Sequence, residues 1–284
     1  MGVNNTVLSR LFTQYAFNDL VEKNHSTIYS NVVRRYKIDP SGKTNQQVIS
    51  EIYRVLSKSY RNEYFYQNTL LNKLLLGIHN LNTTTALTQI PIGKSKADFI
   101  MINGKAVVYE IKSELDSFER LETQLHDYYR AFNHVCVITS ENNYEKIRKL
   151  LYNGPVGFYV LTKKDTLSKK MRKEPAENNS YLEHSAIFKL LHKSEFENIL
   201  YAFWGRLPEC QPVFYYDECF TLFSTIPIEI AYQMALKELK KRNEVVIEQF
   251  AKVPYELKSL IYFSSTSVKD YTMLNSFLQN EFGG

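Results

Sequence analysis

The fold is decided by the stretch Ala97-Asp98-Phe99-Ile100-Met101-Ile102-Asn103-Gly104-Lys105-Ala106-Val107-Val108-Tyr109-Glu110-Ile111-Lys112, in which two apolar runs flank an Asn-Gly pair. Asn-Gly between two runs rich in β-branched and aromatic residues is the strongest short-range signal for a β-hairpin. The stretch therefore predicts two antiparallel strands, over residues 97–102 and 106–112, joined by a tight turn.

Further strands and helices are predicted on both sides of this hairpin. A helix over 61–76 and a strand over 87–92 precede it. A helix over 117–132, capped by Asp116, follows it, and then come a strand over 134–139, a helix over 144–152 and a strand over 157–162. A hairpin followed by strand–helix–strand crossovers predicts an α/β fold with a mixed sheet and helices on its faces.

The remaining segments are predicted to be mainly helical. Residues 1–60 form a helical N-terminal extension, residues 61–162 the core, and residues 181–284 a helical C-terminal region. Between them, residues 163–180 are predicted to be a basic polar linker. Six basic side chains and one acidic side chain lie within residues 163–173, which accounts for the net charge of +5 of the whole chain. A mobile linker and a contact for the phosphate backbone of nucleic acid are both compatible with this composition.

The composition is that of a globular protein and excludes several classes. The 284 residues are 44% hydrophobic and 23% charged, with 10 Gly and 8 Pro, which is neither a disordered nor a collagen-like composition. The three cysteines lack the Cys-x-x-Cys spacing of a structural zinc site. No run approaches the roughly 18 apolar residues of a membrane helix. We therefore expect a cytoplasmic protein with no membrane partner.

Two carboxylates and a lysine interrupt the apolar strands of the hairpin. Asp98 lies near the start of the first strand, and Glu110 and Lys112 end the second. Burying unpaired charge is costly, and a divalent cation would offset the carboxylates. Mg²⁺, or Mn²⁺ in its place, prefers oxygen ligands, usually one or two carboxylates with water and phosphate. Lys112 beside such a metal could orient or deprotonate an attacking water.

The metal hypothesis sets a condition on the hairpin turn. Residues directly opposed on antiparallel strands point to the same face of the sheet. A two-residue turn would place Asp98 and Glu110 on opposite faces, whereas a bulge or an odd-length loop places them on one face. We therefore predict a three-residue loop over residues 102–104, with Asp98 opposite Val108.

Three polar residues fall on helical faces that are otherwise apolar. Glu63 lies in the first turn of its helix, where it either contacts the metal or a water or is a capping carboxylate favoured by the helix dipole. Gln124 and Tyr128 share the sheet-facing stripe of the following helix. Each alone is an ordinary buried polar residue. Together with the carboxylates they are predicted to support the site or to contact nucleic acid.

Three basic residues are candidates for contact with a phosphate. Lys94 and Lys96 precede Asp98 at alternate positions, and Arg120 lies one turn before Gln124. Each could neutralise a phosphate or could simply be a solvated surface side chain.

The order of these motifs resembles the PD-(D/E)XK nuclease superfamily. Asp98 followed by Glu110-Ile111-Lys112 matches its namesake motif, with Ala97 in place of the proline, and Gln124 with Tyr128 matches the pattern of its RecB-like branch. The segments 61–64, 93–98 and 109–113 are similar to a group of bacterial and phage-borne predicted nucleases. The resemblance implies a restriction-endonuclease-like core over residues 61–162. It also implies metal ligation by Asp98, Glu110 and the Ile111 carbonyl, catalysis by Lys112, and an accessory acid at Glu63.

These expectations combine into a metal-dependent nuclease, with a Mg²⁺-dependent deoxyribonuclease as the main prediction. The alternative is a non-catalytic nucleic-acid-binding or protein-interaction module on the same fold. Endonuclease or exonuclease action, a defined target sequence, and a homodimer or a partner protein are left open by the sequence.

Overall fold

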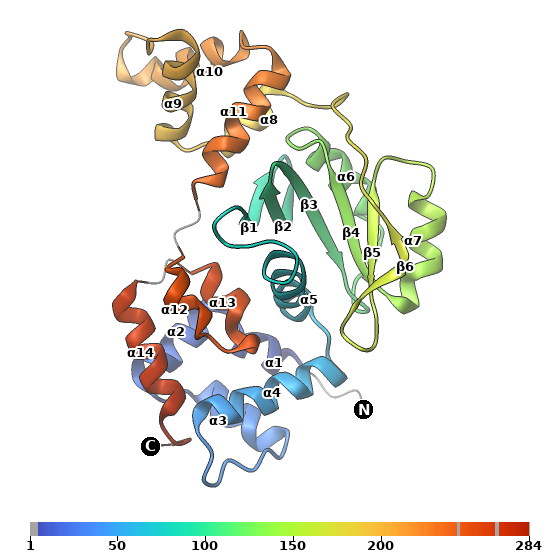
Figure 1. The fold of residues 1–284 in the computed structure, drawn as a ribbon, viewed down its shortest axis with the longest axis vertical. Helices are drawn as coiled ribbons and strands as arrows, with labels where there is room; N and C mark the ends of the chain where they lie inside the picture. The colour runs from blue at the N-terminus through green and yellow to red at the C-terminus, as the bar shows by residue number, and fades with distance from the viewer. Residues whose placement is uncertain (1–4, 243–244, 265–266, 284) are drawn as a thin grey trace. The chain divides into compact units, whose positions relative to one another are not determined.

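The computed structural model describes residues 5–242, 245–264 and 267–283, and the chain divides into two compact units. One unit comprises residues 1–81 and 244–284, and the other comprises residues 82–243. The first, which we call the helical unit, is built from helices. The second, the sheet unit, holds a six-stranded sheet (Figure 1). Within the described ranges, every helix is too short or too polar to span a bilayer.

The two ends of the chain build the helical unit together. The side-chain amide of Asn45 donates to the Phe277 carbonyl at 3.0 Å, and its backbone N–H donates to the Asn280 carbonyl at 2.8 Å. The C-terminal helix is therefore anchored to the N-terminal segment. The elements of this unit are α1 (Thr6–Leu11), α2 (Gln14–Lys23), α3 (Thr27–Arg35), α4 (Asn45–Ser59), α5 (Glu63–Leu70), the π-helical turn η1 (Leu71–Leu75), α12 (Ile247–Ala251), the 3-10 turn η4 (Tyr255–Leu257), α13 (Lys258–Tyr262) and α14 (Val268–Gln279).

The sheet of the sheet unit is mixed, with its strands in the order β1-β2-β3-β4-β5-β6. The first three strands pair antiparallel, β3, β4 and β5 pair parallel, and β6 returns antiparallel to β5. This arrangement confirms the predicted mixed sheet. The strands are β1 (Thr85–Ile92), β2 (Ser95–Asn103), β3 (Lys105–Lys112), β4 (Val135–Ser140), β5 (Gly157–Leu161) and β6 (Leu167–Lys173).

Helices pack on the sheet and share one apolar core with it. Buried side chains of α6 (Leu121–Tyr129) and α7 (Tyr144–Leu151), such as Leu125 and Ile147, belong to the same cluster as Val108 and Val137 of the strands. These two helices are the crossovers between the parallel strands. The cluster extends into the later helices, which are α8 (His184–Leu190), α9 (Lys193–Trp204), α10 (Tyr215–Ser224) and α11 (Ile228–Lys240), with the 3-10 turns η2 (Glu141–Asn143) and η3 (Pro212–Phe214) between elements.

The basic segment predicted as a linker contains a strand. Residues 167–173 form β6, which pairs with β5 at the edge of the sheet. Lys169, Lys170 and Arg172 are exposed on it. Charged side chains on an edge strand oppose pairing with other chains, which gives this basic cluster a structural role. The prediction of a linker over 163–180 is therefore wrong for these seven residues.

The structure also divides the chain differently from the predicted domains. Residues 61–81 belong to the helical unit and not to the unit that holds the sheet. The predicted C-terminal region, 181–284, is split near residue 243 between the two units. Helical periodicity identifies helices but not the unit in which each helix finds its partner, because both units bury apolar stripes of the same kind.

Candidate functional site

The hairpin turn has an odd length, as the metal hypothesis requires. Asn103 pairs with Lys105, so Gly104 stands alone at the turn with a φ of +72°. Glycine adopts this left-handed conformation without the steric penalty of a Cβ. The predicted three-residue loop is wrong in detail, because two of its three residues continue the ladder of hydrogen-bonded strands.

This register places both carboxylates of the hairpin on one face of the sheet. Phe99 pairs with Tyr109, so one further step brings Asp98 level with Glu110. The predicted opposition of Asp98 to Val108 is therefore wrong by two residues. The shift is an even number, so it leaves the two carboxylates on a shared face.

Glu110 is the buried centre of the site, with only 1% of its surface exposed. Gln124 Nε2 donates to its Oε1 at 2.6 Å, and the Tyr128 hydroxyl lies 2.5 Å from its Oε2. Lys112 Nζ lies 3.0 Å from Oε1 and donates to the Gln124 side-chain oxygen at 2.8 Å. The four side chains form one network, and the ammonium offsets the buried carboxylate.

Tyr128 acts as a neutral donor in this network. Burial first, and then the negative charge of Glu110, raise the pKa of the phenol above its ordinary value. The hydroxyl therefore keeps its proton at neutral pH. It also lies 3.0 Å from the Lys96 carbonyl, so Tyr128 connects β2 to the end of β3.

Asp98 is half-buried and is held by backbone groups. Its Oδ2 accepts from the backbone N–H of Ile111 at 2.8 Å, and its carbonyl accepts from the Thr88 hydroxyl at 2.8 Å. Ile111 is buried and pairs with Ile138 of β4. The role of the Ile111 carbonyl as a metal ligand stays a prediction.

A left-handed residue lies across from Asp98. Gln89 has a φ of +56° inside β1. Its two neighbours pair with the residues that flank Asp98, so Gln89 and Asp98 face each other across the ladder. A non-glycine residue pays roughly 1–2 kcal/mol for this conformation. Such strain concentrates at functional sites, and no residue pattern in the sequence signals it.

Asp98 and Glu110 offer two carboxylates to a divalent cation. In the parts of the chain that the structure describes, no group of three or more His, Cys, Asp or Glu residues is placed to hold a metal ion. A cation that retains waters and takes a substrate phosphate, such as Mg²⁺, usually needs only one or two protein carboxylates. Glu110 Oε1 is contacted by both Gln124 Nε2 and the Lys112 ammonium, whereas Oε2 is contacted by the Tyr128 hydroxyl.

Lys94, Lys96 and Glu63 are all exposed. The two lysines lie in the β1–β2 turn and at the start of β2, in the same unit as the network around Glu110. Glu63 is the first residue of α5, which belongs to the helical unit. The contribution of Glu63 to the site stays a prediction.

The helix that carries Gln124 and Tyr128 starts later than predicted. It begins at Leu121, with Arg120 exposed at its N-cap, and not at Ser117. Asp116 does not cap it, because its carboxylate accepts from both the backbone N–H and the hydroxyl of Ser113, at 2.9 and 2.6 Å. Competition from this local turn explains the error, since Asp bonds readily to nearby backbone.

Asp127 is a buried carboxylate that sequence reasoning did not single out. Its Oδ2 accepts from the Ser95 hydroxyl at 2.7 Å and from the Lys94 N–H at 3.1 Å. Its place one residue before Tyr128, beside the apolar stripe of the helix, is the signal that could have identified it.

Comparison with models of protein families gives a match for this chain. The family model described as Bacteriophage P4 protein cII matches residues 56–261, which include the network around Glu110 and parts of both units. The chain belongs to this family. No curated protein and no solved structure gives a significant match.

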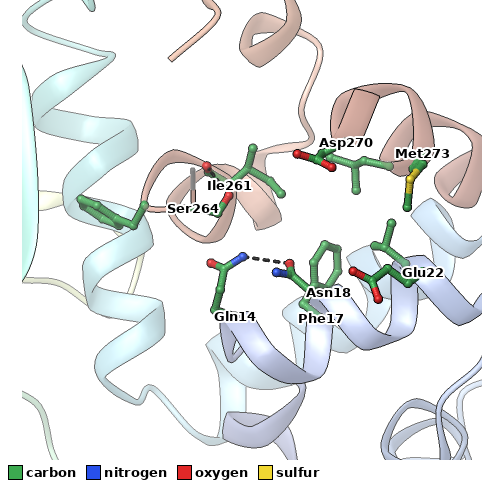
Figure 2. A pocket seen from close by; sticks show the side chains of 11 residues that line it. Gln14, Phe17, Asn18, Glu22, Ile261, Ser264, Asp270 and Met273 are labelled. Atoms are coloured by element: carbon green, nitrogen blue, oxygen red, sulfur yellow. Dashed lines mark hydrogen bonds between the residues drawn. The ribbon is translucent and has the colours of Figure 1, made fainter. Parts of the chain in front are cut away.

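The helical unit of this cII-family protein holds a pocket of about 400 Å³ (Figure 2). Figure 2 shows side chains of α2 facing side chains of the C-terminal segment across it. Three of its polar side chains have structural partners: Gln14 donates to Asn18 at 2.9 Å, and Asp270 caps α14 by accepting from Ser267. The lining residues are Gln14, Phe17, Asn18, Val21, Glu22, Ile261, Phe263, Ser264, Asp270, Met273 and Leu274.

Proposed function

We propose that this protein is a metal-dependent nuclease that hydrolyses phosphodiester bonds of nucleic acid, with DNA as its main substrate. The observation that carries the proposal is the buried contact between Glu110 and Lys112, on the sheet face shared with Asp98. Removing a carboxylate and an ammonium from water costs several kcal/mol per ion, which a purely structural role does not repay well. In phosphodiester cleavage, the carboxylate would bind the metal and the ammonium would act on the attacking water or a phosphate oxygen.

Each member of the network has a role in this proposal. Asp98 and Glu110 would hold Mg²⁺ or Mn²⁺, which would activate a bound water and offset charge on the phosphate. Lys112 presents an ammonium to the attacking water or to a phosphate oxygen. Gln124 and Tyr128 fix the carboxylate of Glu110, so that the ligand oxygens are oriented before a metal binds.

The position of the network in the sheet supports binding of a substrate. Lys112 is the last residue of β3, at the edge where the parallel strands β3, β4 and β5 end. Open α/β sheets bind ligands outside the carboxyl ends of their strands. The β1–β2 turn reaches the same edge, because β2 runs antiparallel to β3. Exposed Lys94 and Lys96 are thus available to phosphate groups there.

The proposal is tested by a cleavage assay on linear duplex, supercoiled and single-stranded DNA, with Mg²⁺, Mn²⁺ or EDTA. We expect metal-dependent cutting that Lys112→Ala lowers by about 10²- to 10⁴-fold. Lys105→Ala is the matched control, because Lys105 is an exposed lysine at the opposite end of β3. Asp98→Ala should also abolish the thermal stabilisation by metal. No cutting of any substrate, with no metal-induced thermal shift, would contradict the proposal.

The second candidate function is a non-catalytic binding module. It is favoured by large hydrophobic side chains exposed on α9, η3 and α10, namely Tyr201, Trp204, Phe214 and Tyr216. Exposed apolar surface of this kind marks interaction sites. Binding of DNA or of a protein that is insensitive to metal, without cleavage, would favour this candidate over the nuclease.

A further inference from the structure

The β1–β2 turn is fixed by a buried carboxylate from α6. Asp127 is only 7% exposed, and its Oδ2 accepts from both the Ser95 hydroxyl and the Lys94 N–H. Two hydrogen bonds from consecutive residues to one oxygen restrict the backbone of the turn. Hydrogen bonds to a charged acceptor are also stronger than bonds between neutral groups.

Gly93 shows how closely the turn passes over this carboxylate. Its φ is +61°, and a Cβ added there would lie 2.5 Å from Asp127 Oδ1. Only glycine fits such an approach without displacing the carboxylate. The backbone of the turn therefore packs directly against the Asp127 side chain of α6.

Arg130 links Asp127 to Glu183, which lies just before α8. Arg130 Nη1 lies 3.7 Å from Asp127 Oδ1, and Arg130 Nη2 lies 2.8 Å from Glu183 Oε2, just before α8. The hydrogen bond with Glu183 is the main reason that the pKa of Arg130 is raised. Arg130 and Glu183 therefore help to hold the Asp127 carboxylate that fixes the turn.

The same helix holds the turn at a second point, next to the network. Tyr128 follows Asp127 and contacts both the Lys96 carbonyl and Glu110. The backbone of Lys94 and Lys96 therefore keeps a fixed position relative to Glu110, while their side chains remain exposed. Two lysines on a fixed backbone lose less entropy on binding a ligand than two lysines on a mobile loop, because only their side chains have to be ordered.

Building on the proposed nuclease function, we propose that Asp127 is a positioning residue that makes residues 93–96 a phosphate-binding turn. Lys94 and Lys96 contact backbone phosphates of the nucleic acid next to the phosphodiester at the Asp98–Glu110 site. Asp127 acts through these lysines and touches neither the metal nor the substrate.

A double-mutant cycle in DNA binding tests this inference. Binding of labelled DNA is measured by fluorescence anisotropy with the full-length protein in EDTA, which suppresses metal-dependent cleavage. We expect Asp127→Ala and the pair Lys94→Ala/Lys96→Ala each to weaken binding by about tenfold. Their combination should be no weaker than the lysine pair alone, because Asp127 has no effect without the lysines. Additive losses would overturn the inference.

Two further variants separate positioning from a general structural effect. Asp127→Asn keeps an acceptor oxygen for the Ser95 hydroxyl and the Lys94 N–H, so it should restore most of the affinity. Asp116→Ala is the matched control, because Asp116 also holds a turn by accepting from an N–H and a hydroxyl, those of Ser113. Any effect of Asp116→Ala should add to that of the lysine pair.

The outcomes distinguish this inference from the proposed function. If the unmodified protein binds DNA and metal but the cycle is additive, only the role of Asp127 is overturned. If the unmodified protein binds neither, the proposed function fails and the phosphate-binding turn fails with it. Asp127→Ala should also accelerate hydrogen exchange at the Lys94 amide. This measurement reports on the hydrogen bond between Lys94 and Asp127 in the absence of DNA.

Discussion

The helical unit and the sheet unit bury polar groups of different kinds. In the helical unit, Asn68 is fully buried, and its amide donates to the Tyr53 hydroxyl and to the Tyr255 carbonyl, both at 3.0 Å. Its side-chain oxygen accepts from the Ser259 N–H at 2.9 Å. All the groups in these hydrogen bonds are neutral. A structural role, holding the helices together, is sufficient to explain why they are buried.

The sheet unit buries charges instead. Glu110, Lys112 and Asp127 lie in its interior, where ionised groups lose their hydration. The difference shows which feature identifies a candidate site. The pocket in Figure 2 is a cavity of the helical unit, yet Gln14, Asn18 and Asp270 on its lining already have structural partners. Buried charge that packing alone does not explain is the better indicator.

The largest effect is expected at the buried ion pair. Lys112→Met leaves Glu110 without its ammonium, so the free energy of unfolding should fall by about 3–5 kcal/mol. Glu110→Gln added to Lys112→Met removes the uncompensated charge and should recover most of this loss. Cleavage should stay abolished in both variants. Urea denaturation and the cleavage assay check this, and recovery of cleavage in the double variant would show that the pair is only structural.

The helical unit should respond in the opposite way. Asn68→Ala removes three hydrogen bonds at a buried position and should lower the free energy of unfolding by about 2–4 kcal/mol. Metal binding and DNA affinity should not change. The control Asn31→Ala, at an exposed position, should stay within about 0.5 kcal/mol. Loss of the metal-induced thermal shift in Asn68→Ala would contradict the contrast between the two units.

Two glycines within the sheet unit separate backbone strain from contact with Asp127. Gly93 and Gly104 both have a positive φ, but a Cβ at Gly104 would meet no atom within 4 Å. Gly104→Ala should therefore cost about 1 kcal/mol for conformation alone. Gly93→Ala should cost about 2–3 kcal/mol, because it also displaces the carboxylate of Asp127. Equal losses of unfolding free energy in the two variants, measured by denaturant unfolding, would argue against close contact between the turn and Asp127.

The smallest effect concerns the pH dependence of the sheet unit. Burial first, and then the positive charge of Lys105, lower the pKa of His134 below its ordinary value. The unfolded chain therefore binds a proton at this residue before the folded chain does. Stability should fall as the pH drops from the ordinary histidine pKa, about 6.5, to the lower folded value. His134→Gln should flatten this part of a stability–pH curve, and an unchanged curve would assign the dependence to other groups.

Local patterns are sufficient to predict most of the elements that carry the candidate site. Asn103-Gly104 between apolar runs predicted the hairpin, and the order of strands and helices around it predicted a mixed sheet, which the structure confirms. Glu110 and Lys112 stood out as charges on apolar strands, and Gln124 and Tyr128 as polar residues on an apolar stripe. These signals are visible in one sequence because side-chain periodicity depends only on local geometry.

Only the tertiary structure decided the partners of these residues. The single-residue turn at Gly104, the left-handed Gln89 across from Asp98 and the brace from Asp127 to residues 93–95 all depend on contacts between separate elements. The same holds for the basic segment that became edge strand β6, and for the C-terminal helix that joined the N-terminal segment. The sequence determined which faces must be buried, and long-range packing determined what covers them, because an apolar stripe specifies burial but not its partner.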